Sequence, residues 1–282
     1  MPAFADTCDI KAPVCFGLNW EKTSLDSVKK TITSFQTKDK EGNTPLHFAA
    51  RNNPHPEIIE YLIAHGFNVN SRGAKAASPL HLSVAHNLNI EVSKSLISNG
   101  ALVNSKDKNK ISPLHWAARN SSKPELITYL IEQGANIHAK SINGVTPLFW
   151  AADSNTNPEV IKALIVQGAD INAHSNFGIT PLHLAAFNNT NPKIIEMFIL
   201  EGAKLNILSD SGYTSLHAVV QSRRPIDIKE KIIILLLKHG ANPTLRDNLG
   251  RTAADIGKEI SNFNKTNAYA KLLAATQAGD EE

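Results

Sequence analysis

The chain has 282 residues, of which 42% are hydrophobic, 20% charged and 6% aromatic, and its formal net charge is +3. This is the composition of a folded chain rather than a disordered one, and so small a charge does not argue for nucleic acid. The charge is uneven, because residues 1–140 hold 16 Lys and Arg against 12 Asp and Glu, whereas the remainder holds 13 against 14. A basic first half suits an acidic partner surface, but we favour the simpler interpretation that lysines keep a long surface hydrated.

Two cysteines, Cys8 and Cys15, lie close together near the start of the chain. Two are too few for a disulfide framework or a zinc site, so we expect a reducing compartment. The first residues show no secretion signal, no apolar run has membrane-spanning length, and the last residues carry no lipidation motif. We therefore expect a cytoplasmic protein that does not enter a membrane.

Residues 24–32, Ser-Leu-Asp-Ser-Val-Lys-Lys-Thr-Ile, read as a half-polar helix. From residue 39 onward a tetrapeptide then returns at a fixed spacing. Its copies are Thr44-Pro-Leu-His, Ser78-Pro-Leu-His, Ser112-Pro-Leu-His, Thr146-Pro-Leu-Phe, Thr180-Pro-Leu-His, Thr214-Ser-Leu-His and a degenerate Thr252-Ala-Ala-Asp. Successive copies start 34 residues apart five times and then 38. Because Ser and Thr cap helices and proline fits the first helical turn, each copy predicts the start of a helix.

A second helix is predicted in each repeat from an apolar stripe such as Ile58, Ile59, Leu62 and Ile63. It is followed in successive repeats by a glycine, at Gly66, Gly100, Gly134, Gly168, Gly202 and Gly240. A turn glycine also precedes the tetrapeptide in five copies, whereas Ala76 and Lys110 occupy its place in the other two. Because glycine adopts positive φ without a steric penalty, we expect those two loops to be strained.

The spacing predicts six repeats between two ends. The repeats span 39–72, 73–106, 107–140, 141–174, 175–208 and 209–246. The last carries four extra residues, about one helical turn, which we expect to lengthen its second helix. Since a terminal repeat has one face without a neighbour, residues 1–38 are predicted to hold a capping helix and residues 247–282 a capping repeat and tail.

These features resemble the ankyrin repeat family. The resemblance is carried by the T-P-L-H tetrapeptide, the Ala49-Ala50 type of pair and the Gly168-Ala-Asp-Ile-Asn type of ending, and it covers roughly residues 39–278. It implies an all-α fold, an α-solenoid of stacked helix-turn-helix units with projecting hairpin loops and a concave protein-binding face. Most units are one residue longer than is usual for the family, and the extra residue falls between the two helices.

The tetrapeptide histidines raise the question of a metal site. Packed helices lie about 8–10 Å apart, which is too far for imidazoles of adjacent repeats to share one ion. We therefore expect each ring to hydrogen-bond near its capping Ser or Thr and the adjacent loop. No nucleophile elbow, phosphate-binding loop, dinucleotide fingerprint or zinc-protease motif is present. We predict a protein that is not an enzyme and that uses no cofactor or metal.

A binding surface is predicted from the positions expected to face the concave side, which are positions two, three, five and thirteen of each repeat. In the early repeats these residues are polar, as in Lys40, Glu41, Asn43 and Arg51. From the fourth repeat they become apolar, giving Ile142, Val145, Phe177, Ile179, Phe187 and Tyr213. Such a patch is typical of a protein–protein interface. The sequence therefore predicts a monomeric adaptor or inhibitor that binds a protein partner on this face.

An alternative function uses the basic first half, including Lys75 and Lys108. The chain would then be a regulatory subunit that binds a nucleic-acid-binding protein or nucleic acid itself. The absence of interleaved aromatic residues in that region argues against nucleic acid.

Two expectations come from the resemblance alone. Loop asparagines of ankyrin repeats are substrates of an asparaginyl hydroxylase in animal cells, often with a leucine eight residues earlier. This implies hydroxylation of Asn70, Asn104 and Asn172, whereas Asn206 lacks the leucine. Loops of the form Asn-x-Asn-Pro-Glu also resemble repeats of bacteria that live inside eukaryotic cells, which implies an effector translocated into a host cell.

Overall fold

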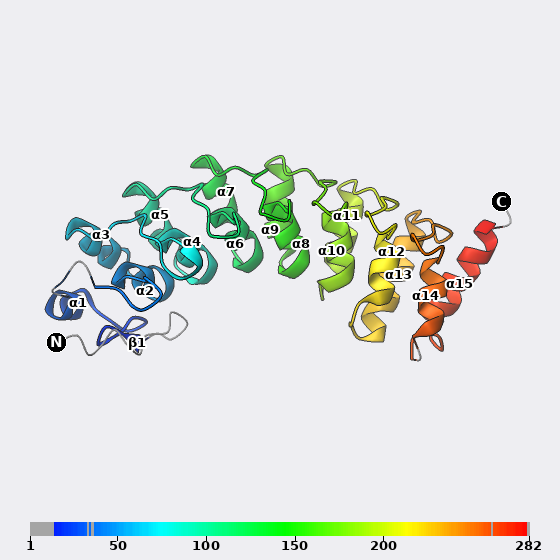
Figure 1. Cartoon of the computed structure of the whole chain (residues 1–282), viewed down its shortest axis with the longest axis horizontal. Helices are drawn as coiled ribbons and strands as arrows, with labels where there is room; N and C mark the ends of the chain where they lie inside the picture. Colours follow the sequence, from blue (N-terminus) through cyan, green and yellow to red (C-terminus); the bar gives the residue numbers. More distant parts are fainter. Residues whose placement is uncertain (1–13, 33, 35–36, 261, 281–282) are drawn as a thin grey trace. The chain divides into compact units, whose positions relative to one another are not determined.

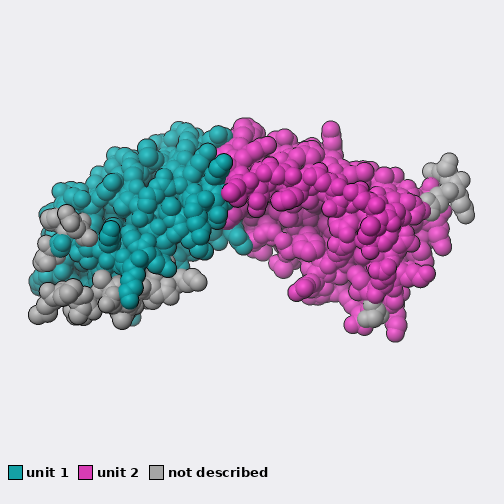
Figure 2. Space-filling model, in the orientation of Figure 1, with its two compact units in different colours: residues 1–136 teal, residues 137–282 magenta. Residues whose placement is uncertain are grey.

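The computed structural model describes residues 14–32, 34, 37–260 and 262–280, which are mainly helical (Figure 1). The chain forms two compact units, residues 1–136 and 137–282 (Figure 2). Within each unit, the first helices of successive repeats form an inner row and the second helices an outer row. The predicted all-α solenoid is therefore confirmed.

The described part of the N-terminal unit contains three helix pairs. Its inner helices are α2 (Pro45–Asn52), α4 (Pro79–His86) and α6 (Pro113–Asn120), and α4 packs between the other two. Its outer helices are α3 (Pro56–Ala64), α5 (Ile90–Ser98) and α7 (Pro124–Glu132), and a 3-10 turn, η2 (Ala74–Ala76), precedes α4.

Among its described residues, the C-terminal unit contains four helix pairs. Its inner helices are α8 (Pro147–Ser154), α10 (Pro181–Asn188), α12 (Ser215–Gln221) and α14 (Ala253–Glu259). Its outer helices are α9 (Pro158–Val166), α11 (Pro192–Leu200), α13 (Ile226–Lys238) and α15 (Asn267–Asp280). The predicted lengthening is confirmed, because α13 has 13 residues whereas α9 and α11 have 9 each.

The core repeats with the sequence. Leu46 of the tetrapeptide, Ala49 after it, and Ile59 and Leu62 of the outer helix are fully buried. Burial of one such leucine or isoleucine is worth about 1.5–3 kcal/mol. Because the other repeats place mostly apolar residues at these four positions, with Ser83 and Ser93 of the second repeat as exceptions, the stack is stabilised mainly by contacts between neighbouring repeats.

The glycine pattern has the predicted backbone role. Gly66 and Gly144, for example, have φ values of 95° and 74°. Ala76 and Lys110 occupy the same left-handed region, at 59° and 60°. The predicted strain in these two loops is therefore present, since a side chain in this region costs roughly 1–2 kcal/mol.

The N-terminal end combines the predicted helix with a hairpin. Helix α1 (Leu25–Thr31) begins after Ser24, as expected. Strands β1 (Val14–Cys15) and β2 (Leu18–Asn19) pair in front of it, with their turn at Phe16 and Gly17. The hairpin was not predicted, because strands of two residues are too short to show a period of two.

This end segment covers the first repeat. The side chain of Trp20 is fully buried, and the ring of Phe16 meets that of Phe48 edge to face, 5.4 Å between centroids. The Asn53 side chain donates to the carbonyl oxygen of Trp20 over 2.7 Å. Together these contacts show how the open face of α2 is closed.

One of the two cysteines, Cys15, differs from the expectation. Cys15 is disulfide-bonded, whereas the sequence suggested reduced cysteines in a reducing compartment. The chain has one other cysteine, Cys8, which lies outside the described residues.

None of the helices in the described part of the chain is both long enough and apolar enough to cross a membrane.

Candidate protein-binding surface

The six residues of the predicted patch all lie in the C-terminal unit, on its loops and on the inner helix α10. Three of them are well exposed: Ile142 at 57%, Phe177 at 58% and Phe187 at 39%. The other three, Val145, Ile179 and Tyr213, are half-buried. The patch is therefore a row of exposed loop tips bordered by partly covered side chains.

Backbone hydrogen bonds place successive loop tips side by side. The amide N–H of Asn176 donates to the carbonyl oxygen of Asn143 over 3.0 Å, and its side chain donates to that of Ile142 over 3.1 Å. One repeat further, the N–H of Asp210 donates to the carbonyl oxygen of Phe177 over 3.1 Å. Because hydrogen bonds join the two loops, Ile142 and Phe177 are held on neighbouring loops.

Phe187 lies near the C-terminal end of α10, beside a polar pair. The side-chain amide of the next residue, Asn188, donates to Asp153 of α8 over 2.5 Å. This hydrogen bond joins the ends of two adjacent inner helices and leaves the Phe187 ring partly exposed. The inner helix α10 thus presents a partly exposed aromatic ring one residue before an asparagine that binds the neighbouring inner helix.

Tyr213 is held more firmly than an exposed contact residue would be. Its ring stacks on the imidazole of His217, with centroids 5.6 Å apart and planes at 5°. Its hydroxyl accepts a hydrogen bond from the Gln221 side chain over 2.9 Å. Tyr213 therefore contributes to the packing of its own repeat as well as to the surface.

Sequence reasoning missed three large side chains in comparable places. Trp116 and Trp150 stand at position ten of their repeats, three residues before position thirteen, and both are half-buried. Leu249 is 75% exposed and occupies the same loop position as Phe177. The helical spacing of three would have pointed to the two tryptophans, and continuing the loop count past Tyr213 would have found Leu249.

The tetrapeptide histidines are structural, as predicted. Nδ1 of His47 accepts a hydrogen bond from the N–H of Thr44 over 3.0 Å, and Nε2 lies 3.2 Å from the carbonyl oxygen of Ala77 in the next loop. His81 repeats this arrangement with Ser78 and Ile111. Burial lowers the pKa of both histidines to about 4. Each ring therefore stays neutral, capping its own helix and binding the next repeat.

The asparagines considered for hydroxylation also connect repeats. The Asn104 amide donates to the carbonyl oxygen of Gly134 over 2.7 Å, and its oxygen accepts from the N–H of Asn136 over 2.8 Å. Asn70 makes the same pair of bonds with Gly100 and Leu102. The oxygen of Asn172 likewise accepts from Lys204. Their side chains fasten each loop to the turn after the next outer helix.

A second row of asparagines follows the inner helices. The Asn87 amide donates to the carbonyl oxygens of Ala50 and Asn53, over 2.9 and 2.8 Å. In the other unit, Asn189 makes the same two bonds, to Ala152 and Asn155. These asparagines explain the first position of the Asn-x-Asn loops.

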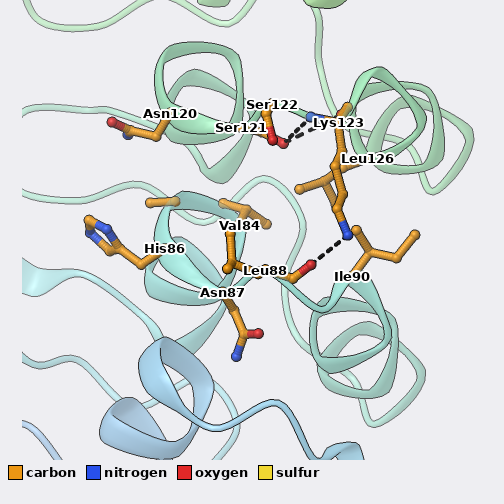
Figure 3. Close-up of a pocket in the computed structure, with 11 residues that line it drawn as sticks. Val84, His86, Asn87, Leu88, Ile90, Asn120, Ser121, Ser122, Lys123 and Leu126 are labelled. Atoms are coloured by element: carbon orange, nitrogen blue, oxygen red, sulfur yellow. Dashed lines mark hydrogen bonds between the residues drawn. The ribbon is translucent and has the colours of Figure 1, made fainter. Parts of the chain in front are cut away.

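The third repeat departs from this pattern and leaves a pocket. Ser121 stands where the asparagine is expected, and a serine lacks the amide that reaches back to the preceding repeat. A small pocket of about 40 Å³ lies there, lined by residues that include Val84, Asn87, Ser121 and Leu126 (Figure 3). Across it, Lys123 donates to the carbonyl oxygen of Leu88. The pocket is far smaller than the ~300–1,000 Å³ of a small-molecule site.

No group of three or more His, Cys, Asp or Glu side chains able to hold a metal ion occurs among the residues that the structure describes.

Comparison with known proteins agrees with the repeat architecture. A family model described as ankyrin repeats (3 copies) matches residues 20–107, 80–174 and 148–247. The chain therefore belongs to the ankyrin repeat family. Ankyrin repeat domains generally mediate protein–protein interaction and are typically not enzymes. No curated protein matches the chain.

Solved structures share the fold. The human ASB11 ankyrin repeat domain is similar with a TM-score of 0.70 and 24% identity, over 83% of this chain and 98% of that one. The ankyrin repeat domain of Bcl-3, described as a unique member of the IkappaB protein family, is similar with a TM-score of 0.63 and 22% identity. This match covers 83% of this chain and 100% of that one. At this level of identity the likeness concerns the fold alone.

Proposed function

We propose that the chain is a monomeric, non-enzymatic adaptor or inhibitor that holds a protein partner against the loop tips and inner helices of its C-terminal unit. The observation that carries this proposal is the exposure of Ile142, Phe177 and Phe187. The first two lie on neighbouring loops that hydrogen bonds hold together, and Phe187 lies on the inner helix α10. Exposed large apolar side chains that are grouped in this way favour a protein interface, and aromatic residues dominate the energetics of such interfaces.

The binding face can be tested by site-specific crosslinking. A photoreactive phenylalanine analogue at position 177 should crosslink a partner in the producing cells, and the same analogue at Glu196, exposed on the outer helix α11, should not. The crosslinked protein is then purified for affinity measurements. Equal crosslinking of one protein from both positions would contradict a binding face on the loops.

Affinity for that partner tests the side chains. Phe177→Ala with Phe187→Ala should weaken binding by about 2 kcal/mol or more, the scale of interface hot spots. Glu196→Ala serves as the control and should leave the affinity unchanged. Unchanged affinity of the double variant would reject the patch.

We infer a cytoplasmic location, in the producing cell or, for a translocated effector, in the host cell. The disulfide at Cys15 counts against this location, because disulfides are rare in the cytosol. Fractionation of the producing cells, or of the host cells for an effector, should recover the chain in the cytosolic fraction. Recovery only outside that fraction would contradict the cytoplasmic location.

A further inference from the structure

The loop that joins the first repeat to the second and the loop that joins the second to the third carry an unbalanced positive charge. Five basic side chains lie exposed on these two loops, and we call them the basic loop patch: Arg72, Lys75, Lys106, Lys108 and Lys110. None of the five forms an ion pair with any other residue in the described part of the chain. In the C-terminal unit, by contrast, Arg251 pairs with Asp247 at 2.8 Å.

The one acid on these loops is occupied within its own loop. Asp107 is only 8% exposed, and its Oδ1 accepts the backbone N–H groups of Asn109 and Ile111 over 2.8 and 2.9 Å. Its carboxylate therefore stabilises the turn and makes no direct pair with a lysine. The five cations remain available to an outside anion.

The two loops are fixed side by side. The N–H of Lys108 donates to the carbonyl oxygen of Lys75 over 3.0 Å, and Arg72 reaches the carbonyl oxygens of Ala76 and Lys106. Because the backbone of both loops is already fixed, a partner does not have to order the loops on binding, and only the exposed side chains lose conformational freedom. The patch is thus a preformed surface rather than a set of independent lysines.

Lys110 also has an unusual backbone conformation. It has a φ of 60° at the turn position where five other loops have glycine. A lysine intended only to keep the surface hydrated fits any exposed position with negative φ, where it causes no strain. Residues retained in strained conformations are enriched at functional sites, so this outlier favours a use for the charge.

We propose that the basic loop patch binds an extended acidic segment of a protein partner. Alternate side chains of an extended segment point the same way about 7 Å apart, so its carboxylates can follow the exposed cations along the loop tips. Residues 68–111 contain no Phe, Trp or Tyr on which single-stranded bases could stack, which favours a protein segment over nucleic acid. This inference rests on the proposed function only in that the partner is a protein, and it uses different residues.

The test measures peptide binding to the full chain by fluorescence anisotropy at low ionic strength. The probe is a labelled peptide of six Glu-Ser pairs, compared with six Lys-Ser pairs and with a heptathymidylate that carries six phosphates. The Glu-Ser peptide should bind most tightly, and its affinity should fall as salt is added. Tighter binding of the oligonucleotide, or no binding of the Glu-Ser peptide, would overturn the proposal.

Two variants separate charge from strain. Lys110→Gly removes both, so it should raise the midpoint of thermal unfolding by about 2 °C and weaken peptide binding about two- to five-fold. Ala76→Gly relieves the same strain in the neighbouring loop and should raise the midpoint without changing the affinity. If both variants bind the peptide equally well, Lys110 has no role in binding.

Further controls distinguish this inference from the proposed function. Lys162→Gln, an exposed lysine of the C-terminal unit, changes the net charge as Lys110→Gly does and should leave peptide affinity unchanged. Phe177→Ala with Phe187→Ala should also leave it unchanged, because those residues lie outside the patch. A loss with Lys162→Gln equal to that with Lys110→Gly would show only nonspecific attraction and overturn the patch.

Discussion

Nε2 of His183 lies 2.8 Å from the carbonyl oxygen of Tyr213, thirty residues further along the chain. Nδ1 of the same ring accepts the N–H of Thr180 over 3.1 Å, so the neutral ring carries its proton on Nε2 and donates it to Tyr213. One imidazole thus caps its own helix and joins two repeats. Burial lowers the pKa of His183, and protonation at Nδ1 would set two N–H groups against each other.

Stability should therefore fall in mild acid. His47 and His81 have folded-state pKa values of about 4 against 6.5 when unfolded, so between these pH values the unfolded chain binds more protons and stability decreases as pH falls. At pH 5 the loss should be on the order of 2 kcal/mol per histidine. Urea unfolding at pH 7.5, 6, 5 and 4.5 measures it.

A histidine replacement provides the control for this acid sensitivity. In the C-terminal capping repeat, Asp255 stands where the other repeats have the histidine, and its carboxylate oxygen accepts the N–H of Thr252. His47→Asn with His81→Asn keeps an acceptor that does not titrate, so the slope between pH 6.5 and 4.5 should become shallower. An unchanged slope would show that other groups cause the acid sensitivity.

Restoring the missing asparagine should stabilise the N-terminal unit. Ser121→Asn should fill the pocket and donate to the carbonyl oxygens of Val84 and Asn87, as Asn87 does one repeat earlier. Two hydrogen bonds predict a gain of about 1–2 kcal/mol in the free energy of unfolding. The reciprocal change, Asn189→Ser, should cost a similar amount. Equal stability of Ser121→Asn and the parent would mean that the pocket already holds bridging water.

Tyr213 should affect stability, unlike the loop-tip residues. Tyr213→Ala removes the stacking on His217 and leaves the Gln221 amide without its partner, so a loss of about 1–3 kcal/mol is expected. Phe177→Ala, at a side chain that is 58% exposed, should stay within about 0.5 kcal/mol. Thermal and urea unfolding of the two variants give the comparison. A loss at Phe177 equal to that at Tyr213 would place Phe177 in the packing as well.

Removing the C-terminal end should unfold the chain locally. Helix α15 packs on α13, where Ile233 and Leu236 are fully buried. Deleting residues 247–282 should expose them, so hydrogen exchange should quicken across 209–246 while residues 39–106 keep their protection. Uniformly faster exchange would instead indicate that the repeats unfold as one cooperative body.

Hydroxylation should depend on local opening. Leu62, Leu96 and Leu164, the leucines eight residues before the three asparagines, are fully buried in the folded repeats. An enzyme that contacts these leucine side chains can do so only when the repeat unfolds locally. After incubation with an asparaginyl hydroxylase, mass spectrometry should find an added oxygen at Asn70, Asn104 and Asn172. The hydroxylated fraction of Asn172 should be higher in the destabilised variant Asn189→Ser than in the parent chain. Asn206 is the internal control, and oxygen there in equal amount would contradict the leucine requirement.

The sequence by itself determined the helices, their ends and their number per repeat. Proline at Pro56 and glycine at Gly66 act within a few residues, so their spacing marks a helix and its end before any tertiary contact is known. The longer α13 followed in the same way from four inserted residues. The strained turns at Ala76 and Lys110 were also predictable, because the neighbouring repeats show glycine at that place.

Only the tertiary structure decided which side chains remain exposed and which join repeats. Val145 and Phe177 look alike in the sequence pattern, but one is half-buried and the other exposed. The bond from Asn189 to Ala152 spans 37 residues, and the loss of its counterpart at Ser121 leaves a pocket. These outcomes depend on atoms of the adjacent repeat. Those atoms are about one repeat length away along the sequence and come into contact only when the helices stack.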